Sequence, residues 1–166
     1  YGHQLENLGL LRQNGTLKAE DGEALVENRG LVVNTFGETE TKPSAALKFY
    51  NQDLNPDELP VAADAEALLA YQAAETACRV DGAITMDGDL TLTSDLYLSQ
   101  DASLEVTGTL TMGGNIVVCN MGAISAKELR GSHYSYLECI GDLTVEALDL
   151  SYGAACYQEG RLTVET

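Results

Sequence analysis

Four cysteines are the most reactive side chains that this sequence offers, and their spacing limits their chemistry. Cys78, Cys119, Cys139 and Cys156 are separated by steps of 41, 20 and 17 residues. Cysteines that bind structural zinc come in close pairs with about two to four residues between them, and that spacing is absent here. No histidine adjoins any of the four, so we expect no thiol nucleophile. Buried free thiols and disulfides between neighbouring parts of the fold are the two interpretations, and we favour the buried free thiols.

Carboxylates are the second candidate for chemistry, because acids gather in two short stretches. The two groups are Asp81, Asp87 and Asp89, and then Asp142, Glu146 and Asp149. Glycoside hydrolysis needs two carboxylates close together, and calcium-dependent chemistry needs a metal with a base. The acids stand in turn-like surroundings, and the Gly/Asp nonapeptide that binds Ca²⁺ in repeat proteins is missing. We therefore assign them to turns and solubility, and predict no catalytic, cofactor-binding or metal-binding residue.

The segment "SHYSYLE" at 132–138 brings together His133, Tyr134 and Tyr136. Exposed aromatic side chains on a loop could contact a sugar or a protein. A tolerated insertion with packed tyrosines is the simpler explanation, and it is the one we favour. His3 stands near the start of the chain without a pattern around it.

The charge of the chain excludes some partners. With 26 acidic and nine basic residues, the formal net charge is −17. Nucleic acid is excluded as a partner, because binding phosphates requires a clustered surplus of Lys and Arg. An anionic membrane surface is disfavoured for the same reason, and no apolar run approaches the roughly 18 residues of a membrane span.

A repeated phrase organises the second half of the sequence. "GDLTV" at 141–145 returns as "GRLTV" at 160–164, and steps of 19 or 20 residues backwards give "GAISA", "ASLEV" and "GAITM". Alternation of apolar and polar residues in each phrase indicates a β-strand. One face of these strands is expected to form an inward column, made of Ile84, Leu104, Ile124, Leu143 and Leu162. The outward column is expected to be Thr85, Glu105, Ser125, Thr144 and Thr163.

Two further strands follow in each register. The second comprises 90–92, 110–112, 129–131 and 148–150, and the third comprises 96–98, 116–119, 136–139 and 154–157. Three short strands in a turn of about 19–21 residues describe one coil of a parallel β-solenoid, with coils spaced about 4.8 Å apart. The crossover rule favours right-handed winding. The predicted fold is therefore all-β, a right-handed parallel β-helix.

The outward Thr and Ser column resembles a flat ice-binding face only superficially, because it is broken at Glu105. The acids do not stack in the predicted coils either. The cysteines, in contrast, all fall two to four residues before the glycine that opens the next coil, with Leu98 at that place in the coil lacking one. This pattern predicts an inward cysteine column and places Cys119 and Cys139 on neighbouring strands, within disulfide range.

The first half of the chain has its own organisation. "LENLGLL" at 5–11 returns as "VENRGLVV" at 26–33, which would place Asn7 over Asn28. Residues 38–60 hold all three prolines and are expected to be a connector. Residues 64–77 form an Ala-rich helix in our prediction, with Asp64 as N-cap and with Leu68, Leu69, Gln72 and Thr76 at helical spacing. The predicted organisation is solenoid coils at 1–37, a connector at 38–60, a capping helix at 61–80 and the main solenoid at 81–166.

The helix running into "CRVDGAITMDGDLTLTSDLYLSQDASLEVTG" resembles the start of pectate-lyase-like right-handed β-helix modules. The resemblance covers residues 61–166 and rests on pattern. Such modules are common in large bacterial cell-surface and adhesin-type proteins. The resemblance implies a location at the bacterial surface or outside the cell. It also implies a host protein or a glycan as the ligand.

Our functional expectation is a non-enzymatic structural or adhesive segment of a longer bacterial surface protein, with solenoid coils able to meet end to end. One alternative is a fragment of a carbohydrate-active β-helix enzyme, a polysaccharide lyase or hydrolase. The other is a polymer-forming β-helix of the bactofilin type. A capped end argues against the polymer, because it cannot accept another coil.

Overall fold

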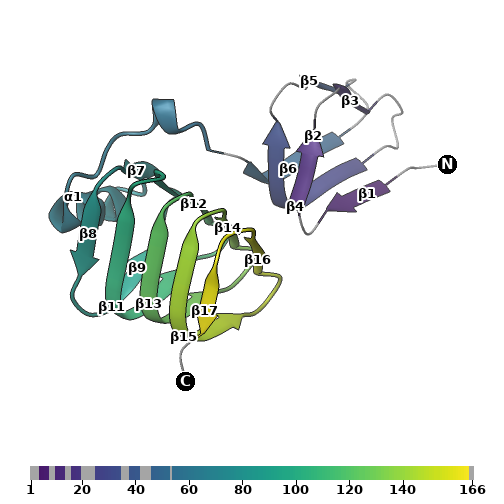
Figure 1. Cartoon of the computed structure of the whole chain (residues 1–166). Coiled ribbons are helices and arrows are strands. Elements are labelled where there is room, and N and C mark those ends of the chain that lie inside the picture. Colours follow the sequence, from purple (N-terminus) through teal and green to yellow (C-terminus); the bar gives the residue numbers. More distant parts are fainter. Residues whose placement is uncertain are drawn as a thin grey trace. The chain divides into compact units, whose positions relative to one another are not determined.

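The structure is a computed structural model, and Figure 1 shows its secondary-structure elements in order along the chain. It describes residues 54–164 with their side chains, and before them the backbone of the strands at 4–7, 10–13, 16–19, 25–34, 38–41 and 46–52. The chain divides into two compact units, Tyr1–Asp53 and Leu54–Thr166.

The first unit consists of parallel strand pairs. In one sheet, β4 (Leu25–Asn34) pairs with β1 (Gln4–Asn7), β2 (Leu10–Gln13) and β6 (Ala46–Gln52). In a second, β3 (Thr16–Ala19) pairs with β5 (Glu38–Thr41). The backbone of Asn7 lies beside that of Asn28, as the repeat predicts. The side chains of this asparagine pair lie outside the described part of the structure.

Residues 38–60, the expected connector, contain two strands of the first unit. Strands β5 and β6 both lie in this range, and β6 continues the register of β4 with Leu25 opposite Ala46. The offset of 21 residues is the same as between β1 and β4, so β6 adds a third layer. The segment contains no copy of the "LEN" phrase, so the repeat could not be recognised from its letters.

A short 3₁₀ helix and one α-helix open the second unit. The 3₁₀ helix η1 spans Pro56–Glu58, and α1 spans Ala65–Ala73. Asp64 caps α1 as predicted, with its Oδ1 accepting a 2.8 Å hydrogen bond from the N–H of Ala67. The helix ends four residues earlier than expected, because Glu75 adopts a left-handed backbone with φ of 51°.

Only part of the predicted helix face is buried. Leu68 and Gln72 are buried, whereas Leu69 is 48% exposed and Thr76 lies beyond the end of α1. The helix is short and apolar on several sides, so sequence spacing alone overestimated the width of its packed face.

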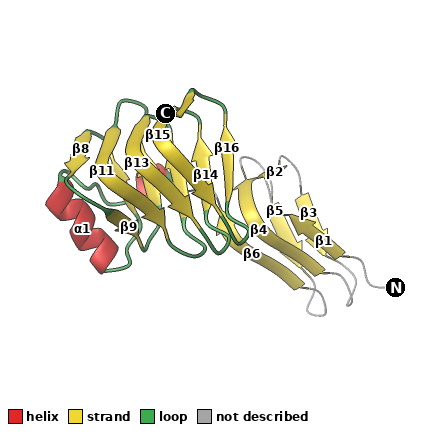
Figure 2. Ribbon diagram, turned by 90° about the horizontal axis from the view of Figure 1, so that it is seen from below, coloured by secondary structure: helices red, strands yellow, loops and turns green. Residues whose placement is uncertain are grey.

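The rest of the second unit is a β-solenoid of about five turns, drawn in Figures 1 and 2. One sheet has the order β16-β14-β12-β10-β7, and the other has the order β17-β15-β13-β11-β8 with β9 also on β11. All of these pairs are parallel. The first sheet comprises β7 (Cys78–Val80), β10 (Leu96–Leu98), β12 (Val117–Asn120), β14 (Tyr136–Cys139) and β16 (Ala155–Gln158). The second comprises β8 (Ala83–Met86), β9 (Leu90–Leu92), β11 (Ser103–Met112), β13 (Ala123–Gly131), β15 (Asp142–Leu150) and β17 (Leu162–Val164).

The predicted inward and outward columns are confirmed residue by residue. Ile84, Leu104, Ile124, Leu143 and Leu162 are successive partners across five strands. The first four are at most 3% exposed, and Leu162 is 43% exposed on the last strand. The outward column pairs in the same register. Layers of Leu, Ile and Val therefore fill the interior.

The predicted first and second strands are separate only in the first coil. There β8 and β9 are distinct, whereas β11, β13 and β15 each contain both segments in one long strand. A register irregularity between Val106 and Thr109 marks the bend that divides the two segments. The first and second predicted strands of a coil therefore belong to one bent sheet, and the third belongs to the other sheet.

Helix α1 covers the end of the solenoid at its first coil, and Figure 2 shows it beside β8 and β9. Leu68 is completely buried in the solenoid core. Gln72 Oε1 accepts hydrogen bonds from the N–H groups of Thr93 and Ser94 at 2.8 and 3.0 Å. These contacts close the first turn, so the predicted capping helix is confirmed.

Candidate functional site

The four cysteines are free thiols, and Cys78, Cys119 and Cys139 are buried. Cys119 and Cys139 lie on the neighbouring strands β12 and β14, as predicted, but they do not lie opposite one another and Cys119 does not face inward. Cys119 lies opposite Glu138, and Cys139 lies opposite Asn120. The two thiols therefore point to opposite faces of the sheet and cannot form the cross-coil disulfide.

The cause of this error lies in the alternation of side chains along a strand. Cys78, Cys139 and Cys156 stand four, two and four residues before the next glycine, whereas Cys119 stands three before it. An odd separation places Cys119 on the outward face, where its Sγ lies 3.8 Å from Glu138 Oε2. Whether the number of residues from a cysteine to the next glycine is odd or even therefore indicates the face of the strand. Treating separations of two to four residues as equivalent concealed this difference.

Burial determines the chemistry of the inward thiols. It raises the pKa of Cys78 and of Cys156 from 9.0 to about 11, and it also raises the pKa of Cys139. A thiol with a raised pKa stays protonated at neutral pH, and the protonated thiol is a poor nucleophile and a poor metal ligand. These three residues therefore serve as small apolar groups of the interior.

Three of the six clustered carboxylates, Asp87, Asp89 and Asp142, accept hydrogen bonds from the next coil, which fits the turn role predicted for them. Asp89 Oδ1 accepts from the Thr109 N–H at 2.7 Å, and Asp87 Oδ1 accepts from Thr107 Oγ1 at 3.2 Å. Asp142 Oδ1 accepts from the N–H of Arg161 at 3.4 Å, one coil further on. These bonds tie each turn to its neighbour in the stack.

Asp81 is different, because it lies in a groove on the outer side of the first sheet. The groove has a volume of about 720 Å³ and extends from η1 over the first strands to the turns that follow β12 and β14. Its described lining residues are Pro56, Asp57, Arg79, Asp81, Tyr97, Ser99, Gln100, Met121 and Ile140. This volume lies in the usual range for ligand pockets, about 300–1,000 Å³.

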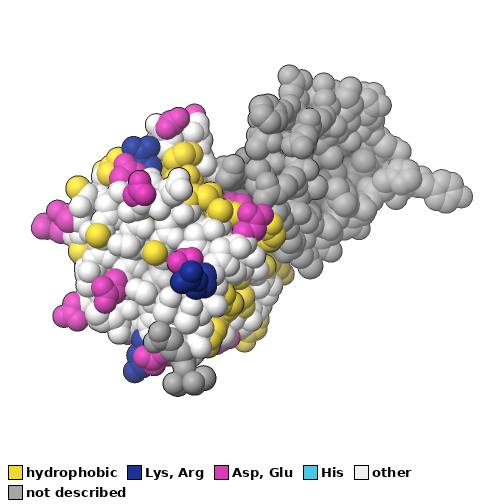
Figure 3. Space-filling view, viewed as in Figure 1, with side chains coloured by type: hydrophobic (Ala, Val, Ile, Leu, Met, Phe, Trp, Pro, Cys, Tyr) yellow, Lys and Arg dark blue, Asp and Glu magenta, His cyan; other side chains and the backbone are white. Residues whose placement is uncertain are grey.

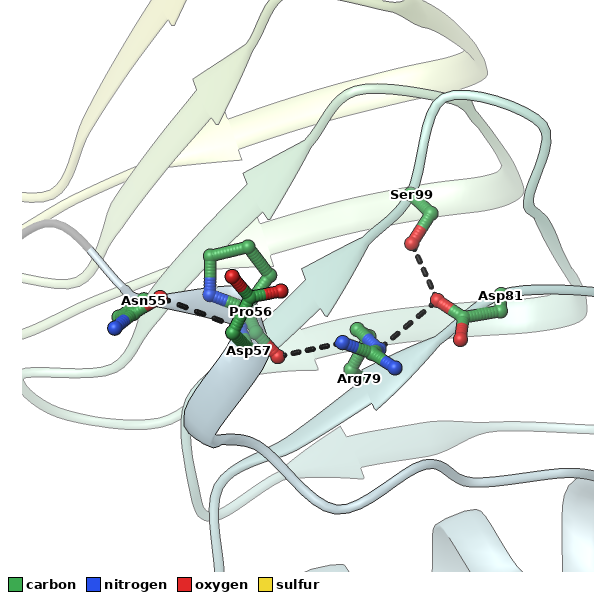
Figure 4. Close-up of polar contacts among 6 residues, drawn as sticks. All are labelled: Asn55, Pro56, Asp57, Arg79, Asp81 and Ser99. Atoms are coloured by element: carbon green, nitrogen blue, oxygen red, sulfur yellow. Dashed lines mark hydrogen bonds and ion pairs between the residues drawn. The ribbon is translucent and has the colours of Figure 1, made fainter.

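Figure 4 shows Arg79 between Pro56 and Asp81, with contacts to both. Its Nη1 donates a 2.7 Å hydrogen bond to the carbonyl oxygen of Pro56, and its Nε lies 3.0 Å from Asp81 Oδ1. The Nε–H does not point at that oxygen well enough to make a hydrogen bond, so the contact is an ion pair. Asp81 Oδ1 also accepts a short hydrogen bond from Ser99 Oγ. The guanidinium is therefore held in place from both sides.

From the sequence alone, Asp81 is expected in a turn, and no motif points to Arg79 or Asp57 as functional residues. A signal for the first pair exists, because residues two apart on a strand share a face, and Arg79 and Asp81 are such a pair. Asp57 reaches the groove only because η1 lies against β7. The bond from Arg79 to Pro56 spans 23 residues, and no local pattern encodes it.

The charge in the groove is not balanced. Asp57 and Asp81 face one arginine, and Asp81 is already paired with it. Figure 3 shows the same excess on the solenoid face in view, where acidic side chains are scattered and basic ones are few. Met121 and Ile140 add an apolar side to this polar groove.

A second surface with smaller hollows lies on the outside of the other sheet, along the bend in β11, β13 and β15. Two adjoining hollows of about 330 and 370 Å³ share Thr107, Lys127 and Glu146. The outward Glu105, Ser125 and Thr144 line one of them, so this bend does carry polar groups. No two carboxylates lie opposite one another in the register of the described strands there.

The "SHYSYLE" loop divides its aromatic residues between surface and interior. Tyr136 is 2% exposed, while the His133 ring stacks on Tyr152 with centroids 5.1 Å apart. Tyr152 is itself 75% exposed. Packing of a tyrosine is thus confirmed, and a small aromatic stack remains at the surface.

Comparison with protein-family models, with curated proteins and with solved structures finds no match to this chain. Among the described residues, no helix has the length and apolar character needed to cross a membrane. Within that same part of the chain, His, Cys, Asp and Glu side chains form no group suited to a metal ion.

Proposed function

We propose that this chain is a non-enzymatic adhesive and structural segment of a larger bacterial surface protein, of the pectate-lyase-like β-helix kind. The proposal joins the resemblance of residues 61–166 to such modules with the solenoid architecture. It places the chain at the bacterial surface or outside the cell, and it takes a host protein or a glycan as ligand.

One observation carries the proposal: a ligand-sized groove lies on the outside of a stack of hydrogen-bonded coils. Every coil from β8 to β15 fixes its neighbours through paired strands and buried aliphatic layers. Such a stack holds its surface side chains in place without requiring a large globular core. A structural segment that also binds a partner needs surface side chains held in fixed positions in this way.

A carbohydrate-active enzyme is the second candidate, because two carboxylates, Asp57 and Asp81, line the same groove. Hydrolysis with two carboxylates requires one of them to transfer a proton. Asp81 accepts a hydrogen bond from Ser99 and is paired with Arg79, which suits a structural role better than proton transfer. The groove therefore supports binding more than cleavage. The polymer-forming alternative is opposed by α1, which covers the end that another coil would have to join.

The proposal is tested by binding and turnover measured together. The full chain is immobilised and exposed to an array of host matrix proteins and glycans, and in parallel is incubated with acidic and neutral polysaccharides. We expect saturable binding on the array and no new reducing or unsaturated ends in solution. Antibodies against the chain should also label intact cells of the source bacterium.

Release of sugar ends at enzymatic rates would overturn the non-enzymatic assignment. Absence of label on intact cells, with label after lysis, would overturn the surface location. The variant Leu143→Asp serves as control, because it should disrupt the core and remove specific binding.

A further inference from the structure

The groove carries more acidic than basic side chains, with Asp57 and Asp81 against the single described arginine, Arg79. Its one described arginine is engaged on both sides, whereas Asp57 is exposed at the rim. Within residues 54–164, nothing forms an ion pair or a hydrogen bond with the Asp57 carboxylate. One negative charge of the groove is therefore left for a ligand.

We propose that this groove binds a basic, extended segment of a partner protein, with a Lys or Arg side chain of that segment against Asp57. The inference rests on the proposed adhesive function and names the class of its partner. Two features of the groove support it, one for the charged head of a basic side chain and one for its aliphatic stem, and the charge of the whole chain adds a third argument.

The first feature is charge. An ammonium or guanidinium group placed at Asp57 would form a charge-assisted hydrogen bond with a carboxylate that no residue within 54–164 pairs with. Arg79 does not compete for that carboxylate, because its Nη1 is bound to Pro56 and its Nε lies against Asp81. An acidic ligand would instead meet two carboxylates in the same hollow.

The second feature is the apolar side. Met121 and Ile140 come from the turns of successive coils and line the groove together. Lys and Arg carry long aliphatic stems, which pack on apolar surface while the charged head stays with a polar group. A wall of this kind beside a carboxylate fits such a stem.

The third argument is long-range attraction by the whole chain. The whole chain has a formal net charge of −17, which steers basic partners toward it and repels acidic ones. The same field alone would attract any cation anywhere on the surface. A test must therefore separate the groove from the general charge.

The experiment is a fluorescence-anisotropy titration of the full chain with a labelled peptide of alternating Lys and Ser. Peptides of alternating Glu and Ser and of alternating Gln and Ser are the matched ligands. At about 0.15 M salt, where charges beyond roughly 8 Å are screened, we expect only the Lys peptide to bind. Asp57→Asn should weaken this binding about three-fold, as expected for one exposed ion pair.

The control variant is Glu105→Gln, which removes the same charge from the outside of the other sheet. It should change the affinity by less than about 1.5-fold at that salt concentration. Asp57→Lys, which reverses the charge at the rim, should weaken binding by about ten-fold or more. Melting curves of each variant confirm that the solenoid is intact.

Equal weakening by Asp57→Asn and Glu105→Gln would mean that only the net charge matters, and it would overturn the proposal. So would binding of the neutral oligosaccharide cellohexaose, sensitive to Asp57→Asn, without binding of the Lys peptide. That second result would leave the adhesive function standing with a glycan as its ligand. Failure of all array ligands together with the peptide would reject the adhesive function itself.

Discussion

Glycines stacked at the start of each repeated phrase provide a sharp test of how closely the coils approach. Gly141 lies between Gly122 and Gly160 in this column, with an alanine at position 102 and Gly82 at its first member. A Cβ added at Gly141 would lie 2.7 Å from the carbonyl carbon of Gly122 and closer still to its oxygen. Carbon atoms in good contact are about 3.5–4.0 Å apart, so the backbone has to move.

The cost of Gly141→Ala follows from what holds that backbone. The N–H of Gly141 donates to the Asn120 carbonyl at 3.0 Å, and the carbonyl of Gly122 accepts from the Asp142 N–H at 2.8 Å. Separating the coils weakens both bonds, each worth about 1 kcal/mol, and adds overpacking strain of about 1–3 kcal/mol. We expect a loss of about 3 kcal/mol and a melting temperature lower by about 10 °C.

Gly82→Ala is the matched control, because a Cβ at Gly82 meets nothing within 4 Å. It should leave stability unchanged or raise it by up to about 1 kcal/mol through the smaller entropy of the unfolded chain. Thermal melts by circular dichroism measure both variants in the full chain, and hydrogen exchange in β13 and β15 assigns the effect to the solenoid. Equal melting temperatures for the two variants would refute the close stacking of the glycine column.

Three further predictions test the core, the cap and the thiols. Leu143→Asp places a carboxylate at a completely buried site and should lower the free energy of unfolding by several kcal/mol, whereas Thr144→Asp on the outward face should lower it by under about 1 kcal/mol. Equal losses of stability in thermal melts would mean that the register is wrong by one residue. Gln72→Ala removes the acceptor of two backbone N–H groups in the first turn and should lower the free energy of unfolding by about 2–3 kcal/mol. Hydrogen exchange in that turn should become faster, and unchanged exchange would contradict the role of α1 as a cap. Burial raises the pKa of Cys78 and Cys156 from 9.0 to about 11, so unfolding releases protons above pH 9 and stability should fall from pH 9 to about pH 11. Denaturant midpoints across that range should depend less on pH when both cysteines are replaced by alanine, and an unaltered dependence would mean that these thiols are not buried.

The register of the sheet that contains β11, β13 and β15 could be predicted, because its repeat fixes the size of the side chains as well as their polarity. Leu or Ile recurs at the first inward position of every phrase, and a small residue recurs two positions earlier, where neighbouring backbones approach. Both constraints change if the register slips by one residue, so the alignment had a single solution.

The other sheet could not be aligned in the same way. Its strands carry buried residues on both faces, such as Val118 and Cys119 on β12, so alternation of polarity is lost. Counting from the cysteines then replaced the true alternation and misplaced Cys119. The layer formed by β6 could not be recognised either, because it keeps the 21-residue spacing but does not repeat the "LEN" phrase.

The groove could not be predicted from the sequence, because segments far apart in the chain form it. Arg79 and Asp81 could be paired from their spacing on a strand, but the groove also needs η1 and the turns of two later coils. Contacts between residues 20 or more positions apart are set by the stacking of the coils. Only the assembled solenoid brings Asp57 beside Met121 and Ile140.

The most direct test of the proposed function is the chemical fate of a bound ligand. Ligands retained on the immobilised full chain after overnight incubation are eluted and weighed by mass spectrometry, with ligand kept on an uncoated surface as reference. A non-enzymatic adhesive segment predicts that every retained glycan or protein is recovered with its original mass. Recovery of cleaved ligand, abolished by Asp57→Asn, would contradict that claim and identify the groove as a catalytic site.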